Sequence, residues 1–363
     1  MSVGALIRAL REARGWSQGR LASALCEAST RPTLTREEIS RWENGKRSVG
    51  PFWLAHLART FALPVEVFEA AGVGRPSPIG EVARQGLVAA LDGRASVDDW
   101  QEVTDDYGRA FMTLPAREIE PQLAGDLLLL RRALADSQCL WESVARLSVV
   151  MGMAVASLNG PAASARWYRT AVKAADRSGG LALREWTRGQ GALALVYEGA
   201  EPSSLIAVTT KALALSQRPS MGRLCALLAQ AHCYARLGEP GPARRDLCAA
   251  DEMFPSVASP PFATVFSMPQ WGYSLTKTLV HARLGDVEQS QREQDTADRL
   301  RPGGLGRFAA HTSVHRALSF VKSGDVGVGL ELARRTVAEL PAEQRSKVLG
   351  GFVAEVKAAA RAT

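Results

Sequence analysis

The sequence predicts an all-α protein in two parts, a compact bundle of five short helices followed by a long array of helix pairs. Two observations predict this architecture. Apolar residues recur at helical spacing over most of the 363 residues,. No segment alternates apolar and polar residues for long enough to predict a strand, so we expect no sheet. We place the bundle at 1–72, a Gly- and Pro-rich linker at 73–80, leading helices at 81–140 and the array at 141–363.

The composition excludes several classes of protein. Hydrophobic residues make up 46% of the chain and charged residues 22%, which are ordinary globular proportions,. No run of 18 apolar residues predicts a membrane span. The five cysteines are odd in number and form no CxxC pair, so we expect neither a disulfide framework nor a zinc knuckle,. The first residues carry no secretory signal, and we expect a cytoplasmic protein.

The first two helices are defined by their apolar faces and their ends. The first ends at Gly15, a residue that favours helix termination,. Ser17 is a good N-cap for the second helix, whose buried face carries Leu21. After the second helix we expect a loop over Ser29–Leu34, broken by Pro32, and the whole long connection to the third helix is roughly Cys26–Leu34,.

The third helix has the clearest start of the five. Thr35-Arg36-Glu37-Glu38 matches a capping box, in which the Thr hydroxyl bonds a backbone N–H one turn into the helix,. Ile39 and Trp42 point inward three residues apart, and Asn44-Gly45 ends the helix. The bundle is completed by two more helices, Phe52–Phe61 and Val65–Ala71.

Positive charge is concentrated in the bundle. Residues 1–59 hold ten Arg or Lys and five acidic residues, while the whole chain has a net charge of +7. The chain therefore carries most of its excess positive charge in its first sixth. A basic domain permits nucleic-acid binding, although solvated arginines would give the same balance.

Two strings of the bundle agree in order and spacing with a known family. They are Ile7-Arg8-x-Leu10-Arg11-x-x-Arg14-Gly15-Trp16-Ser17-Gln18-x-x-Leu21-Ala22 and Ile39-Ser40-Arg41-Trp42-Glu43-Asn44-Gly45-Lys46-Arg47. With them, residues 3–71 resemble the Cro/CI-type helix-turn-helix family of bacterial regulators, also called the xenobiotic-response-element family. The sequence departs from the family pattern in one place, because the tight turn between helices two and three is replaced by the longer loop.

The third helix is the candidate DNA-reading element. A helix fits the major groove of B-DNA, and side chains on its N-terminal turns reach the edges of the bases. Arg can bond two acceptors of guanine at once, and Glu can accept a hydrogen bond from cytosine. Our candidates for base reading are Arg36, Glu37, Ser40 and Arg41, and we place Thr35, which opens the helix, among the DNA-binding residues.

A second group of residues is expected at the DNA backbone. The resemblance implies that Gln18, at the N-terminus of helix two, lies beside a phosphate. We expect Asn44, Lys46 and Arg47 to hold phosphates and to fix register rather than sequence. For Arg31 a DNA contact and a solvated side chain both stay open.

The family likeness also implies one structural pair in the bundle. Arg11 would pair with Glu43 and brace the third helix rather than touch DNA. This pair separates the residues that build the domain from those that read the nucleic acid.

An internal repeat marks the second part of the chain. Five helices end in a similar way, at Gly160, Gly199, Gly238, Gly285 and Gly324, with spacings of 39, 39, 47 and 39 residues. The longer interval contains a proline-rich insert, Pro255–Pro261, with Pro269 beyond it. A fixed period of this length predicts stacked helix pairs, with a glycine at each turn.

The repeat region loosely resembles tetratricopeptide repeats, and armadillo- or HEAT-like helix pairs stay open as alternatives. Such arrays have concave surfaces that bind peptides or partner proteins. A DNA-binding head joined to an array resembles the peptide-responsive quorum-sensing regulators of Gram-positive bacteria. We therefore expect a peptide or small-molecule effector on the array, with dimerisation alone as the alternative; the ligand-binding residues are unknown.

Catalysis and metal binding find little support in the sequence. There is no phosphate-binding loop and no nucleophile elbow, so we expect no enzyme and no cofactor. His311 and His315 are spaced i, i+4, but no third ligand has a convincing spacing, and we expect no metal,. Trp167-Tyr168 and Trp186 are aromatic residues that we assign to core packing rather than to a pocket.

These observations lead to one preferred function and one alternative. The preferred function is a bacterial transcriptional regulator that binds double-stranded operator DNA as a homodimer, with half-sites about one helical turn (~34 Å) apart. The alternative is an interaction scaffold that sequesters a partner on its array, with DNA binding secondary. No membrane is involved in either.

Overall fold

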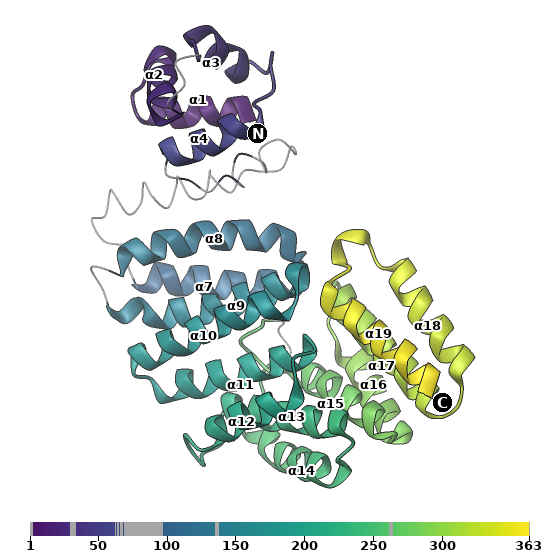
Figure 1. Cartoon of the computed structure of the whole chain (residues 1–363). Helices are drawn as coiled ribbons and strands as arrows, with labels where there is room; N and C mark the ends of the chain where they lie inside the picture. The colour runs from purple at the N-terminus through teal and green to yellow at the C-terminus, as the bar shows by residue number, and fades with distance from the viewer. Residues whose placement is uncertain are drawn as a thin grey trace. The chain divides into compact units, whose positions relative to one another are not determined.

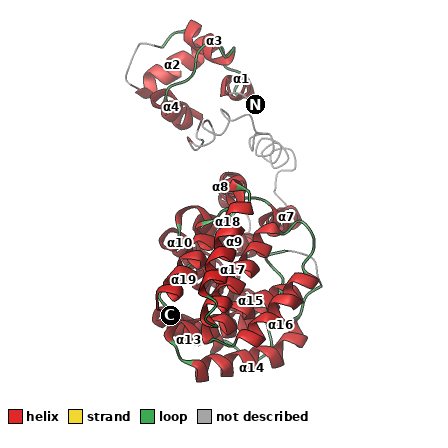
Figure 2. Ribbon diagram, turned by 90° about the vertical axis from the view of Figure 1, so that its right-hand side faces the viewer, coloured by secondary structure: helices red, strands yellow, loops and turns green. Residues whose placement is uncertain are grey.

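The computed structural model describes residues 3–29, 34–61, 63, 65, 68, 97–134, 138–260 and 264–362. Within these ranges every regular element is a helix, which confirms the predicted all-α class (Figures 1 and 2). The chain divides into two compact units, Met1–Gly93 and Arg94–Thr363. The predicted linker at 73–80 lies outside the described residues, and the boundaries at 72, 80 and 140 stay predictions.

The first unit is built from four described helices around a small apolar core. They are α1 (Val3–Ala13), α2 (Gln18–Ser29), α3 (Arg36–Glu43) and α4 (Pro51–Phe61). Leu6, Ile7, Leu21, Leu25 and Ile39 are fully buried in this core. The expected cap of α2 is present, because the Ser17 hydroxyl accepts a hydrogen bond from the Arg20 N–H at 3.1 Å. Of the predicted fifth helix only Val65 and Phe68 are described, and Phe68 is buried in the same core.

The helix α2 ends at Ser29, where the predicted loop over Ser29–Leu34 begins. The longer connection, placed roughly from Cys26, therefore starts about one turn too early. Ser29 is buried like Leu25, one turn earlier, and the core-facing side of the helix therefore extends over another turn. The position of Arg31 lies outside the described residues.

The second unit begins with α7 (Val97–Thr113) and α8 (Ala116–Ala133), followed by a short 3-10 turn η1 (Gln138–Leu140). Ten helices follow in pairs: α9 (Trp141–Asn159) with α10 (Pro161–Ser178), α11 (Leu181–Tyr197) with α12 (Pro202–Leu213), α13 (Met221–Leu237) with α14 (Pro240–Val257), α15 (Gln270–Leu284) with α16 (Val287–Leu300), and α17 (Gly306–Lys322) with α18 (Val326–Glu339). A 3-10 turn η2 (Ala342–Gln344) and α19 (Lys347–Ala362) end the unit (Figure 1).

The predicted glycine period is confirmed by the backbone. Gly160, Gly199, Gly238, Gly285 and Gly324 follow the first helix of each pair, and all five have positive φ, between 74° and 96°. This left-handed conformation is open to glycine at little cost, and it turns the chain so that the second helix packs back on the first. The predicted helix-pair repeat is therefore a property of the folded chain.

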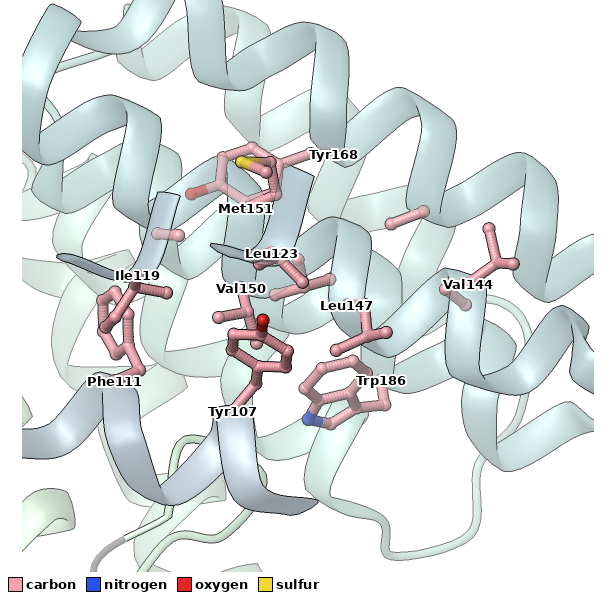
Figure 3. Close-up of a cluster of buried hydrophobic side chains, with 14 of the residues drawn as sticks. Tyr107, Phe111, Ile119, Leu123, Val144, Leu147, Val150, Met151, Tyr168 and Trp186 are labelled. Carbon is pink, nitrogen blue, oxygen red and sulfur yellow. The ribbon is translucent and has the colours of Figure 1, made fainter. Parts of the chain in front are cut away.

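The largest apolar core lies where α7 and α8 cover the first repeats (Figure 3). Phe111 of α7, Leu123 of α8 and Val150 of α9 pack here beside Tyr168 and Trp186. Tyr168 and Trp186 thus belong to the core, as expected, and the neighbouring Trp167 packs against the same cluster. The burial of these side chains contributes about 25 cal/mol for each Å² of apolar surface removed from water.

The helix α9 forms the axis of this core. With a mean hydropathy of 1.2, it is long and apolar enough to cross a membrane. However, 67% of its most apolar 18-residue stretch is buried inside the helix array, as expected for the core helix of a globular domain,.

The proline-rich insert continues through residues 264–269 to Pro269, and this part of the insert folds inward against α7. Its Val265 N–H donates to the Gly108 carbonyl of α7 at 3.0 Å. A Cβ at Gly108 would approach the Phe266 ring within 2.5 Å, so only glycine permits this contact. The C-terminal part of the array returns to the same region, since α19 contacts α9 and the Arg307 guanidinium of α17 donates to the Phe111 carbonyl. Residues 264–269 therefore lie within the curve of the array.

Candidate nucleic-acid interface

The third helix of the first unit is fixed at its start by the predicted cap. The Thr35 hydroxyl accepts a hydrogen bond from the Glu38 N–H at 3.4 Å. Ile39 and Trp42 are buried, as the spacing predicted. A Cβ at Gly4 would lie 2.0 Å from the Trp42 carbonyl oxygen, so α1 and the end of α3 pack backbone to backbone. The opposite side of α3 is left facing away from the core.

The last residue of α3 is the centre of a buried polar cluster. Glu43 accepts from the Arg11 Nε at 2.6 Å and from the Gln18 amide at 2.8 Å. Burial disfavours the charged carboxylate, but the hydrogen bonds from Arg11 and Gln18 outweigh it and hold the pKa of Glu43 below its ordinary value,. The implied Arg11–Glu43 brace is therefore confirmed. It ties the end of α3 to α1 and to the first turn of α2.

The turn after α3 is held by a second set of local bonds. The Arg8 guanidinium donates to the Asn44 side-chain oxygen at 2.7 Å. The Asn44 amide in turn donates to the Ser40 carbonyl at 2.8 Å. Gly45 follows with a φ of 67°, and after this turn the Lys46 N–H donates to the Arg41 carbonyl of α3 at 2.9 Å,. Arg8 was not among the residues that the sequence singled out.

The outward side of α3 presents the predicted base-reading residues. Arg36, Glu37 and Arg41 are exposed, and Ser40 is half-buried. Hydrogen bonds from its own backbone N–H and from the Thr35 hydroxyl hold the pKa of Glu37 below its ordinary value. This carboxylate is therefore ionised at neutral pH and lies at the N-terminus of the helix, where the dipole favours a negative charge.

One acidic residue organises two of the predicted DNA contacts. Glu38 accepts from Arg41 at 2.9 Å and from Arg47 at 2.8 Å. The two guanidinium groups are largely exposed, at 57% and 60%, whereas the Glu38 side chain is only 19% exposed. Glu38 was predicted only as part of the cap. Its ion pairs with both arginines were not predicted, because residue spacing does not indicate which acidic side chain a flexible Arg will contact.

The structure thus gathers the predicted residues into one region of the first unit. Eight of them lie on α3 and the turns at its two ends, namely Thr35, Arg36, Glu37, Ser40, Arg41, Asn44, Lys46 and Arg47. Gln18 joins them through its bond to Glu43. Their contacts with DNA stay predictions, since each is placed here in the absence of nucleic acid.

Metal binding was weighed for His311 and His315, in the second unit. The two rings are 6.4 Å apart and tilted, and the His315 Nδ1 lies 2.7 Å from the Thr278 hydroxyl. Across the part of the chain that the structure describes, no three His, Cys, Asp or Glu side chains come together as a metal site. Both histidines are buried, and burial lowers the pKa of His311 to about 3.

Comparisons with known proteins bear on the first unit most directly. Residues 2–71 match the family model of a helix-turn-helix domain. None of the curated proteins matches the chain. The crystal structure of Bacillus thuringiensis PlcR in complex with the peptide PapR7 and DNA aligns with 99% of this chain and 98% of that one, at 12% identity and a TM-score of 0.38. The chain therefore carries an N-terminal helix-turn-helix domain, the module of DNA-binding regulators, followed by a helical-repeat region.

Proposed function

We propose that the chain is a sequence-specific transcriptional regulator of bacterial type that binds a two-fold operator as a homodimer in the cytoplasm. The observation that carries the proposal is the exposed edge of α3, with Arg36, Glu37 and Arg41 on a helix whose two ends are fixed. A rigid helix with charged residues on its free side can enter the major groove without reorganisation.

The division of labour follows from the chemistry of each side chain. Arg36 and Arg41 can each donate two hydrogen bonds to guanine, and the Glu37 carboxylate can accept from cytosine. Lys46 and Arg47, beyond the end of the helix, suit phosphate oxygens, which fix the position of the domain but carry no sequence information. On binding, Arg41 and Arg47 would give up their ion pairs with Glu38 and contact DNA instead. The free energy lost is small, because exposed ion pairs contribute at most about 1 kcal/mol.

The helical-repeat region has two proposed roles. It would hold two chains together, so that two heads meet half-sites about one turn (~34 Å) apart. It would also bind an effector, a peptide or a small molecule, that favours one arrangement of the heads over another. Only an effector with different affinities for the two arrangements can shift the balance between them.

The test is selection of genomic fragments with the purified chain, followed by footprinting of the enriched site. Enrichment of a site with two-fold symmetry would support the proposal. Failure to enrich any sequence at moderate salt, together with a stable complex with another protein, would favour an interaction scaffold instead. The salt concentration of the selection must be fixed, because each phosphate contact steepens the dependence of affinity on salt concentration.

A further inference from the structure

A cavity opens within the curve of the second unit, in the region where the insert meets α7 and α17. The space measures about 1040 Å³ including its open mouth. Its walls are largely apolar and include Met153 of α9, Leu193 of α11 and Leu275 of α15. The insert closes one side with Val265 and Met268. A concave, mostly apolar lining of this kind is typical of sites for small organic ligands.

Three polar side chains converge at one part of this cavity, around the ring of Phe308. The Arg307 guanidinium carbon lies 5.1 Å from the centre of that ring. The Trp271 ring meets it edge to face at 5.5 Å, and the His311 ring is 6.2 Å away. All four residues line the cavity, and they come from two successive repeats. The apolar space therefore has one distinctly polar wall.

Arg307 is the charged member of this wall, and it has no acidic partner. Its guanidinium donates to the Phe111 carbonyl and lies over the Phe111 ring at 4.6 Å. Among the described residues no carboxylate forms an ion pair with it. Burial lowers its pKa to about 10, so the group is still a cation at neutral pH. Arg307 is half-buried, and a cation in such a setting without a counter-ion is an attractive partner for an anion that enters the cavity,.

The two neighbours of Arg307 have polar atoms that no described residue satisfies. The Trp271 side chain is almost fully buried, yet its indole N–H has no acceptor in the described part of the chain. The His311 Nε2 is buried and likewise without a partner there. Buried polar groups are nearly always hydrogen-bonded, so two such atoms beside Arg307 make this wall unusually polar for a buried surface.

We propose that this cavity binds a small amphipathic carboxylic acid, with its carboxylate on Arg307 and its apolar body against Met153, Leu193 and Leu275. The neutral imidazole of His311, which can donate one hydrogen bond and accept another, completes the polar wall. The binding site stands on its own geometry, whereas its use as an effector site rests on the proposed function. The insert and α17 both line the cavity, so occupancy joins the middle and the C-terminal part of the array.

The test compares acids with neutral molecules of the same shape on the full chain, without DNA. The probes are octanoate against 1-octanol and 4-phenylbutyrate against 4-phenyl-1-butanol, with tryptophan fluorescence and thermal shift as readouts. We expect at least one acid to bind about tenfold or more tightly than its alcohol, since hydrogen bonds between charged groups are the strong ones. Equal binding of acid and alcohol, or no binding by either pair, would overturn the proposal.

Two variants assign the preference to the polar wall. Arg307→Met keeps the length of the side chain and removes the charge, and we expect it to abolish the preference for the acid. Arg299→Met is the control, because Arg299 is exposed on α16 and does not line the cavity. Should Arg307→Met fail to fold, Met153→Trp fills the apolar end without touching the charge. It is expected to weaken the acid and the alcohol alike, and unchanged affinity would contradict the site.

The outcome is separable from that of the proposed function. Footprinting on the same preparation reports DNA binding whether or not an acid binds. A wild-type chain that shows no preference for the acid but gives an intact footprint overturns the cavity proposal alone. Acid binding by a protein that gives no footprint supports the cavity as a binding site and contradicts its use as the effector site of a DNA-binding regulator.

Discussion

Glu43 at the end of α3 accepts a hydrogen bond from the Arg11 Nε of α1 at 2.6 Å, and its second oxygen lies 3.0 Å from another nitrogen of the same guanidinium. The pair is bidentate and nearly excluded from water, with 11% of the Arg11 side chain and none of the Glu43 side chain exposed. It joins α1 and α3 through two residues that are 32 positions apart in sequence. The orientation of the proposed reading helix is therefore set within the free domain, before it meets DNA.

Removing one partner of this pair should loosen the first unit. Arg11→Met leaves the Glu43 carboxylate buried with fewer donors, and breaking a buried pair in this way costs about 3 kcal/mol. We expect faster hydrogen exchange in peptides from α1, α2 and α3, with the second unit unchanged. Arg59→Met is the control, because Arg59 is exposed on α4. Equal protection in the two variants would show that the brace is not structural.

The same pair has a pH signature of known sign. The pKa of Glu43 is lowered in the folded chain, so its ionised form stabilises the fold above the ordinary carboxylate pKa of about 4.5,. That contribution is lost as pH falls through the lower folded value. The difference in exchange between wild type and Arg11→Met should therefore shrink on acidification from pH 6 toward pH 3.

Glu38 should lower the affinity of the first unit for DNA of unrelated sequence. It holds Arg41 and Arg47 in the free domain, and it adds a negative charge beside the DNA-facing residues. We expect Glu38→Gln to raise the affinity for unrelated duplexes and to reduce the ratio of specific to non-specific binding, measured by fluorescence anisotropy over a salt series.

The matched control for Glu38 is Glu27→Gln. It removes an equal charge from an exposed position on α2. An equal rise in non-specific affinity in both variants would mean that net charge alone acts, and would contradict a special role for Glu38.

The repeat glycines offer a test of the turn geometry. Gly238 has a φ of 74°, and nothing lies near enough to clash with an added Cβ. Gly238→Ala should therefore lower the free energy of unfolding of the second unit by about 1–2 kcal/mol, purely from the left-handed backbone. Gly241→Ala, three residues later within α14 and equally open, should be neutral or stabilise by up to about 1 kcal/mol,. Urea unfolding measures both, and a similar loss in the two variants would be the contrary result.

Much of the fold could be predicted because its signals are local. The Thr35 cap, the Ser17 cap and the inward pair Ile39 and Trp42 each depend on residues within one or two turns. The glycines of the array were found because one backbone requirement recurs five times. The Arg11–Glu43 pair is a contact between distant residues, and it came from the family resemblance rather than from spacing.

What could not be predicted depends on distant or flexible partners. Arg307 meets the Phe111 carbonyl across 196 residues, and no periodic pattern records that contact. The inward course of residues 264–269 is decided by the space beside Gly108, which forms only when the array has curved. Whether Arg41 and Arg47 contact Glu38 depends on their side-chain rotamers, which the sequence does not specify. For the same reasons, the sequence did not reveal the cavity.

The most direct measurement is selection of genomic fragments followed by footprinting, with wild type, Arg36→Ala, Arg41→Ala and Lys46→Ala side by side. We expect a site with two half-sites about one turn apart. Each arginine change should relax the preference at particular base pairs by about 1–3 kcal/mol. Lys46→Ala should weaken all sequences alike and reduce the salt slope by about 1. A site whose sequence preference survives both arginine changes, or the absence of any enriched site, would show that α3 is not the reading helix.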